Sequence, residues 1–205
     1  MAKKTTKKRV HSGKGAGRSA RKVVRRQQSK KKSSGATAGK SGSGGGAKAM
    51  IDGIMWSHGM LGALLNGWPS DRWTYQSAPT DGHALWQVGH LACVYDWFAN
   101  LLDGQKGNVP EAYNAMFGYG SKPTPDASAY PNVDSVRGVH EGAWERLSKV
   151  LSKMKDEDLA KACAGDTHGL AKNKGEIVRM IAWHDGWHQG QVSNLRKALG
   201  LPGVM

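Results

Sequence analysis

The sequence predicts an all-α protein, a four-helix bundle with a long crossover between its second and third helices, preceded by a disordered basic tail. Four segments repeat apolar residues every three or four positions, and no segment shows the sustained alternation of a strand. A Gly- and Pro-containing connection, residues 105–132, separates the second segment from the third. Four helices with one long connection are typical of a bundle that contains a crossover.

The charge divides the chain at about residue 46. The first 48 of its 205 residues hold sixteen Lys and Arg and no Asp or Glu, whereas the rest holds fourteen basic and sixteen acidic residues. The formal charge of +14 is therefore a +16 tail on a body of −2. All aromatic residues follow residue 48. Because the tail has so little to bury, we expect residues 1–46 to be disordered and residues 47–205 to form the bundle domain.

The apolar repeat sets the expected helices. They are Ala47–Trp68 (closed by Pro69), His83–Leu102, Val133–Met154 and Asn173–Leu199, with short helical turns at Glu111–Phe117 and Asp156–Cys163. Asn173 followed by Glu176 resembles a capping box. The inward stripe expected on the second helix is Trp86, Gly89/His90, Cys93/Val94, Trp97 and Leu101.

The stretch Trp183–Gln191, reading WHDGWHQGQ, carries the strongest chemical signal. His184 and His188 lie four residues apart on the inward stripe of the last helix, so both imidazoles reach the same point. His90 on the inward face of the second helix is the natural third ligand. Three histidines with an open position are typical of a catalytic zinc site, and nickel and ferrous iron also accept imidazoles.

Simpler roles compete with metal binding. A single inward histidine is more often a core residue with a hydrogen bond; this role is favoured for His58, which otherwise approaches the metal site as a second-shell residue. His83, at a helix start, is expected on the surface. Trp86, Trp183 and Trp187 either line the pocket or belong to the core, the commoner place for Trp at helical spacing.

A zinc-protease mechanism is disfavoured. That mechanism needs HExxH, with Glu as the general base beside the first ligand. Here Asp185 stands in its place, one methylene shorter, and the step from His184 turns it away from the inward stripe.

Three motifs resemble the DinB/YfiT-like superfamily. They are the GHL of Gly89–Leu91, the HxxxHxGQ of His184–Gln191 and the LRxxLGxP of Leu195–Pro202. The resemblance covers roughly residues 47–203. It implies a four-helix bundle with a crossover and a divalent metal held by His90, His184 and His188. It also implies a packing or second-shell role for Gln191, and suits Gly190 to a close helix contact, although a tolerated helix glycine is the simpler explanation.

The same resemblance implies chemistry. Characterised relatives are bacterial metal-dependent enzymes that use low-molecular-weight thiols, including bacillithiol S-transferases and mycothiol-dependent isomerases. A histidine rather than a glutamate at position 184 puts this chain nearer the three-histidine members. We therefore expect an S-transferase-like or hydrolytic enzyme with a small thiol or water as the nucleophile and an electrophilic substrate. The alternative is a non-catalytic protein associated with stress or DNA damage.

The tail supports that alternative. Its basic residues are expected to contact nucleic-acid phosphates, and those singled out are Arg21, Lys22, Arg25, Arg26, Lys30, Lys31 and Lys32. The alternative roles for the tail are a solubilising extension and a targeting signal that resembles a nuclear localisation signal. Two cysteines make no disulfide framework, and no apolar run is long enough for a membrane span. We expect a cytoplasmic protein that makes no membrane contact, with association with the nucleoid and formation of a homodimer left open.

Overall fold

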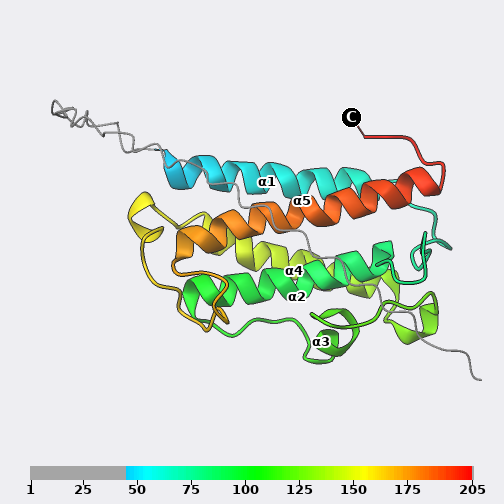
Figure 1. Cartoon of the computed structure of the whole chain (residues 1–205), viewed down its shortest axis with the longest axis horizontal. Coiled ribbons are helices and arrows are strands. Elements are labelled where there is room, and N and C mark those ends of the chain that lie inside the picture. Colours follow the sequence, from blue (N-terminus) through cyan, green and yellow to red (C-terminus); the bar gives the residue numbers. More distant parts are fainter. Residues whose placement is uncertain (1–44, 205) are drawn as a thin grey trace, which may run out of the picture. The chain divides into compact units, whose positions relative to one another are not determined.

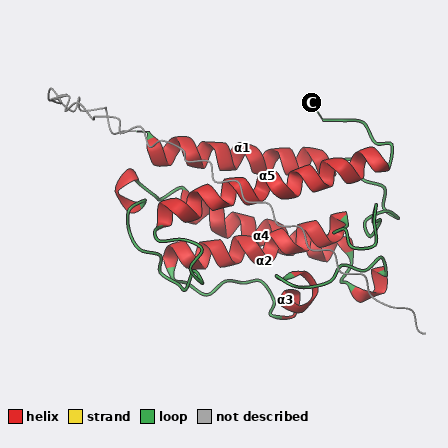
Figure 2. Cartoon of the chain, in the orientation of Figure 1, coloured by secondary structure: helices red, strands yellow, loops and turns green. Residues whose placement is uncertain are grey.

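The computed structural model describes residues 45–204, and the predicted tail contacts lie outside these residues. The described part is helical and contains no strand (Figure 2). Its helices are α1 (Gly46–Leu65), α2 (Ala84–Asp103), α3 (Ala112–Phe117), α4 (Val133–Leu151) and α5 (Lys174–Ala198), with 3₁₀ turns η1 (Ala127–Ala129) and η2 (Asp156–Asp158). No helix of this part is both long and apolar enough to cross a membrane.

The four long helices form two parallel pairs (Figure 1). Helices α1 and α5 run side by side in one direction: the Gln189 side chain donates to the Ser57 carbonyl at 2.8 Å, and Arg196 donates to the Leu64 carbonyl at 2.6 Å. Helices α2 and α4 run the other way. The connection from α2 to α4, which carries α3, must return along the length of the bundle, so the predicted crossover and bundle are confirmed.

Local sequence signals explain where α1 and α2 end. Helix α1 stops at Leu65, three residues before the predicted end, because Asn66 is already extended and Gly67 adopts φ +67°. Helix α2 ends at Gly104, whose φ of +76° suits a residue without a side chain.

Asparagines begin α4 and α5. The Asn132 side chain accepts from the Ser135 amide at 2.8 Å, and that of Asn173 accepts from the Glu176 amide at 2.9 Å. The Glu176 carboxylate accepts instead from the Lys172 amide at 2.7 Å, so only half of the predicted capping box forms. The short helical element after α4 is the 3₁₀ turn η2 alone, so the prediction of a turn reaching Cys163 was too long.

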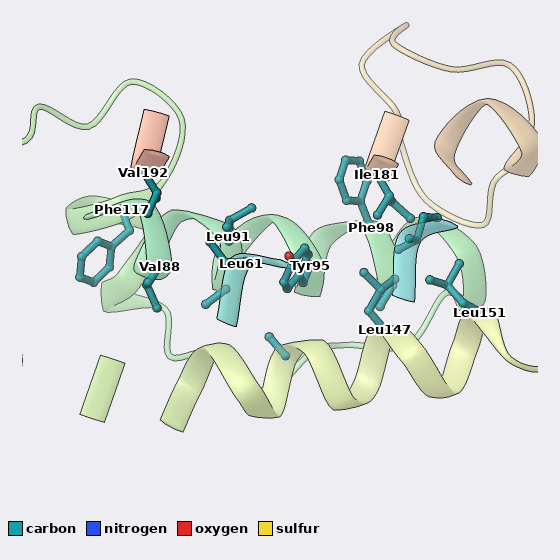
Figure 3. Packing of buried hydrophobic residues seen from close by; sticks show 14 of the residues in the cluster. Leu61, Val88, Leu91, Tyr95, Phe98, Phe117, Leu147, Leu151, Ile181 and Val192 are labelled. Atoms are coloured by element: carbon teal, nitrogen blue, oxygen red, sulfur yellow. The ribbon is translucent and has the colours of Figure 1, made fainter. Parts of the chain in front are cut away.

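Helix α2 is the centre of the core, and its predicted stripe was right for Gly89, His90 and Leu101 and wrong for the other positions. Its most deeply buried large side chains, Leu91, Tyr95, Phe98 and Leu101, point toward the other helices, as Figure 3 shows for the first three. Trp86, Cys93, Val94 and Trp97 of the predicted stripe are only partly buried. Because α2 contacts α3, α4 and α5, it is apolar nearly all round, and a single stripe cannot be read from such a helix.

Candidate metal centre

Helices α2 and α5 bring the three predicted histidines together. The ring centroids of His184 and His188 are 4.4 Å apart, and the ring of His90 lies 5.3 Å from the first and 4.8 Å from the second. One ring nitrogen from each residue lies within 4.8 Å of those of the other two. The four-residue spacing within α5 and the packing of α2 against α5 therefore bring the three imidazoles to one point.

The crossover orients His90. Its Nδ1 donates to the Phe117 carbonyl at 2.7 Å, because a carbonyl oxygen can only accept. This bond puts the proton on Nδ1 and leaves Nε2 with a free lone pair. The Trp86 indole stacks on the same ring at a centroid distance of 4.7 Å and an interplanar angle of 9°, so the ring is held on two sides.

A buried glutamine orients His188. The side-chain carbonyl of Gln87 accepts from Nδ1 of His188, and Gln87 itself donates to the Gly82 carbonyl at 3.0 Å. The Gln191 side chain also lies beside His188. Gln87, which is buried, was missed by the sequence analysis, although a polar residue in an apolar stretch three positions before His90 was an available signal.

His184 is the accessible member of the cluster. It is half-buried, whereas His90 and His188 are buried. Its Nε2 lies 3.2 Å from Nε2 of His188, and the Phe98 ring meets its own ring edge-on at 6.1 Å. Its Nδ1 is buried without a hydrogen-bond partner among the described residues.

Burial keeps the cluster uncharged at neutral pH. Burial, with repulsion from the neighbouring imidazoles, lowers the pKa of His184 to about 4 and that of His188 to about 3. Burial also lowers the pKa of His90, against a smaller opposite effect of the bond to Phe117. Neutral imidazoles are the form that coordinates a metal.

This donor set fits a metal ion. Because the Nδ1 protons of His90 and His188 are engaged, both Nε2 atoms offer lone pairs. Nε2 of His184 lies 3.2 Å from Nε2 of His188, so His184 can donate to His188 when its proton is on Nε2 and can offer a lone pair beside that of His188 when its proton is on Nδ1. Ligand atoms about 2.0–2.1 Å from a tetrahedral zinc ion are separated by about 3.4 Å, close to this one distance. The three-histidine cluster could therefore hold a metal ion.

Comparison with known families agrees with this geometry. A model of the DinB superfamily matches residues 56–192, about two thirds of the chain. The chain belongs to the DinB superfamily. The match runs from the second half of α1 through most of α5 and includes all three histidines of this DinB-superfamily protein. No curated protein matches the chain.

Two other residues lie where the sequence did not place them. His83, expected on the surface, is fully buried: its Nδ1 accepts from the Trp86 amide at 3.0 Å and its Nε2 donates to the Thr124 carbonyl at 3.0 Å. Asp185, expected to turn away from the inward face, is 1% exposed and lies beside the Tyr95 hydroxyl. Burial raises its pKa to about 7, but its position toward Tyr95 gives it no place as a protease-type base.

The remaining predicted positions lie apart from the cluster. His58 stacks on Trp144 of α4 at 3.8 Å, in a part of the bundle separate from His90 and its partners. Trp183 and Trp187 are more than half exposed rather than core residues, and Trp86 covers His90. An added Cβ at Gly190 would meet no atom within 4 Å, so the expected close helix contact is absent from the described residues.

Proposed function

We propose that this DinB-superfamily protein is a metal-dependent enzyme whose nucleophile is a low-molecular-weight thiol or water. His90, His184 and His188 would hold one divalent ion, leaving a position for the nucleophile. The observation that carries the proposal is the convergence of three neutral imidazoles, with no fourth His, Cys, Asp or Glu joining the group among residues 45–204. Three protein ligands and an open position are the catalytic arrangement, whereas structural zinc sites are closed by four.

The protein's own residues prepare the site before any ligand arrives. The Phe117 carbonyl and Gln87 fix the tautomers of His90 and His188, and Trp86 holds the His90 ring in plane. Because His184 is half-buried and the other two histidines are buried, a substrate would approach the cluster from the side of His184. When bound, a divalent ion supplies Lewis acidity that makes a thiol or water nucleophilic at neutral pH.

Metal content tests the first half of the proposal. Elemental analysis of protein purified without a histidine tag should find close to one zinc, nickel or iron per chain. His184→Ala and His188→Ala should lose the metal, whereas the exposed His168→Ala should keep it. Absence of metal from the wild type, with no uptake after zinc, nickel or ferrous iron is added, would reject the metal site.

Turnover tests the second half. The metal-loaded protein is mixed with a cysteine-derived thiol and an alkyl halide, so that a C–S bond forms while halide and a proton are released. Metal-dependent formation of the thioether supports thiol transfer, and metal-dependent ester hydrolysis without a thiol supports the water nucleophile. If the metal-loaded protein catalyses neither reaction across a broad substrate panel, the conclusion is that it binds metal but is not an enzyme.

The charge of residues 1–48 favours a second, separable activity. Sixteen basic and no acidic residues suit sequence-independent binding to nucleic-acid phosphates. If the tail neutralises about eight phosphates, log K should fall against log salt with a slope of about −7. Deletion of residues 1–44 should abolish binding to duplex DNA without changing metal content. Unchanged DNA affinity after the deletion would refute this activity.

A further inference from the structure

Two separate cavities, of about 550 and 510 Å³, open on the domain. The second lies between α1 and α4, away from the histidine cluster. It shares no lining residue with the cluster or with Gln87 and Gln191 that flank it. Its size is within the range of small-molecule sites, about 300–1,000 Å³. The lining that matters for recognition is His58, His140, Glu141, Asp134, Trp68 and Trp73.

Two imidazoles and a carboxylate meet at one end of this cavity. Glu141 Oε1 lies 3.6 Å from Nδ1 of His140, and Glu141 Oε2 lies 4.0 Å from Nε2 of His58. His140 is only 3% exposed, and its Nε2 is buried without a partner among the described residues, as is Nδ1 of His58. Trp144 stacks on His58 at 3.8 Å and fixes the plane of that ring.

The charges at this cavity favour a positive ligand. Interaction with His140 first, and also the charge of Arg137, lowers the pKa of Glu141, so its carboxylate is ionised at neutral pH. Burial lowers the pKa of His58 to about 4, so that imidazole is neutral. The guanidinium of Arg137 lies 6.0 Å over the Trp73 ring. The lining holds two acidic residues, Asp134 and Glu141, and one basic residue, Arg137, so their formal charges sum to −1.

We propose that the cavity between α1 and α4 binds a small organic amine, with its ammonium group against the Glu141 carboxylate. A primary ammonium has three N–H donors and no acceptor. The ionised Glu141 carboxylate accepts from it, and the neutral His58 imidazole lies beside that carboxylate, with its Nε2 4.0 Å from Oε2. A metal ion fits less well, because the three-histidine cluster is the group of described residues whose ligand atoms all lie within 4.8 Å of one another.

The rest of the cavity suits an apolar body on that amine. Leu61, Leu65 and Val88 line it together with the Trp68 and Trp73 rings, which are 6.1 Å apart. Burying such a body contributes about 25 cal/mol per Å² of apolar surface, and aromatic faces also attract cations. The predicted ligand is therefore an amphipathic alkyl or arylalkyl amine, and this site is independent of the proposed metal chemistry.

Calorimetric titration with 2-phenylethylamine tests the proposal on the full chain at pH 7.5. We expect saturable binding in the calorimeter, and the same titration followed by NMR should move the indole N–H resonances of Trp68 and Trp73. We expect no binding of 3-phenylpropionate, which has a similar phenyl body and the opposite charge. Glu141→Gln should weaken 2-phenylethylamine at least about tenfold, because a charge-assisted bond is replaced by a neutral one. Glu145→Gln, one turn along α4 and paired with Lys149, is the matched control and should bind as the wild type does.

The outcomes separate clearly. Because the Glu141 side chain is largely exposed, its replacement by Gln should leave the unfolding temperature unchanged, and that measurement accompanies each titration. No binding by the wild type at millimolar amine, equal binding of 3-phenylpropionate, or equal affinity of Glu141→Gln and wild type would each overturn the proposal. A metal-free protein should bind the amine equally well, so failure of the metal site does not affect this result.

Discussion

The side-chain carbonyl of Gln87 on α2 accepts a hydrogen bond from Nδ1 of His188 on α5. This bond joins the two helices that carry the histidine cluster and decides which nitrogen of His188 faces His90 and His184. Residues that orient a metal ligand in this way also raise its basicity. Gln87 therefore acts on the cluster through His188, as a positioning residue.

Gln87→Leu should weaken metal affinity about 10- to 100-fold, because His188 loses the acceptor that sets its tautomer. Competition with a chromogenic chelator measures this change in affinity. Gln87→Glu keeps an oxygen acceptor and should retain most of the affinity.

The matched control for this prediction is Gln189→Leu. Gln189 is adjacent to His188 in sequence, but its amide donates to Ser57 on α1, away from the cluster. Equal losses in Gln87→Leu and Gln189→Leu would point to general loosening of α5 rather than to orientation of His188.

His83 gives the stability of the fold a defined pH dependence. Burial lowers its pKa from 6.5 to about 4, so the unfolded chain binds the proton first as the pH falls. The free energy of unfolding should therefore be largest above pH 6.5 and fall between pH 6.5 and pH 4. His58 and His184, whose pKa values are also lowered to about 4, add to the same trend.

His83→Asn isolates the part that belongs to residue 83. Asn can accept from the Trp86 amide as an N-cap but does not titrate, so the loss of stability between pH 7 and pH 5 should be smaller than in the wild type. Urea unfolding at the two pH values measures it, with the exposed His168→Asn as control. A pH response identical to that of the wild type would show that His83 does not contribute.

Periodicity predicted the fold and the cluster because both depend on regular helices. His184 and His188 lie one turn apart in any helix, and the capping asparagines Asn132 and Asn173 act within three residues of themselves. Such relationships are local, so the sequence alone predicts them. The third histidine of the cluster, His90, needed the further assumption that α2 turns that face toward α5.

Contacts between distant segments were beyond that reasoning. The Phe117 carbonyl reaches His90 from the crossover, which has no periodicity to interpret. The sequence analysis placed Asp185 away from the inward face because of its angle from His184. Helix α5, however, packs against both α1 and α2 and so buries more than one stripe, and Asp185 lies on a second buried stripe. His83 was placed on the surface because the loop that covers it, around Thr124, is distant in sequence.

Gly89→Ala should destabilise the domain by about 1–3 kcal/mol, the usual cost of overpacking. A Cβ at this position would overlap the ring of Phe117, so α3 would have to move away from α2. Because the Phe117 carbonyl orients His90, metal affinity should fall with stability. Urea unfolding and chelator competition measure the two effects, and a variant as stable as the wild type would contradict this account of Gly89.

Gly190→Ala should have the opposite effect. Position 190 is exposed on α5, and an added Cβ would meet no atom within 4 Å. Alanine in a helix interior is favoured over glycine by about 1 kcal/mol, so the free energy of unfolding should rise by about that amount while metal affinity stays unchanged. Urea unfolding measures the first quantity, and size-exclusion chromatography over a range of concentrations accompanies it. A loss of stability that depends on protein concentration would instead show that Gly190 permits close contact with a second copy of the chain.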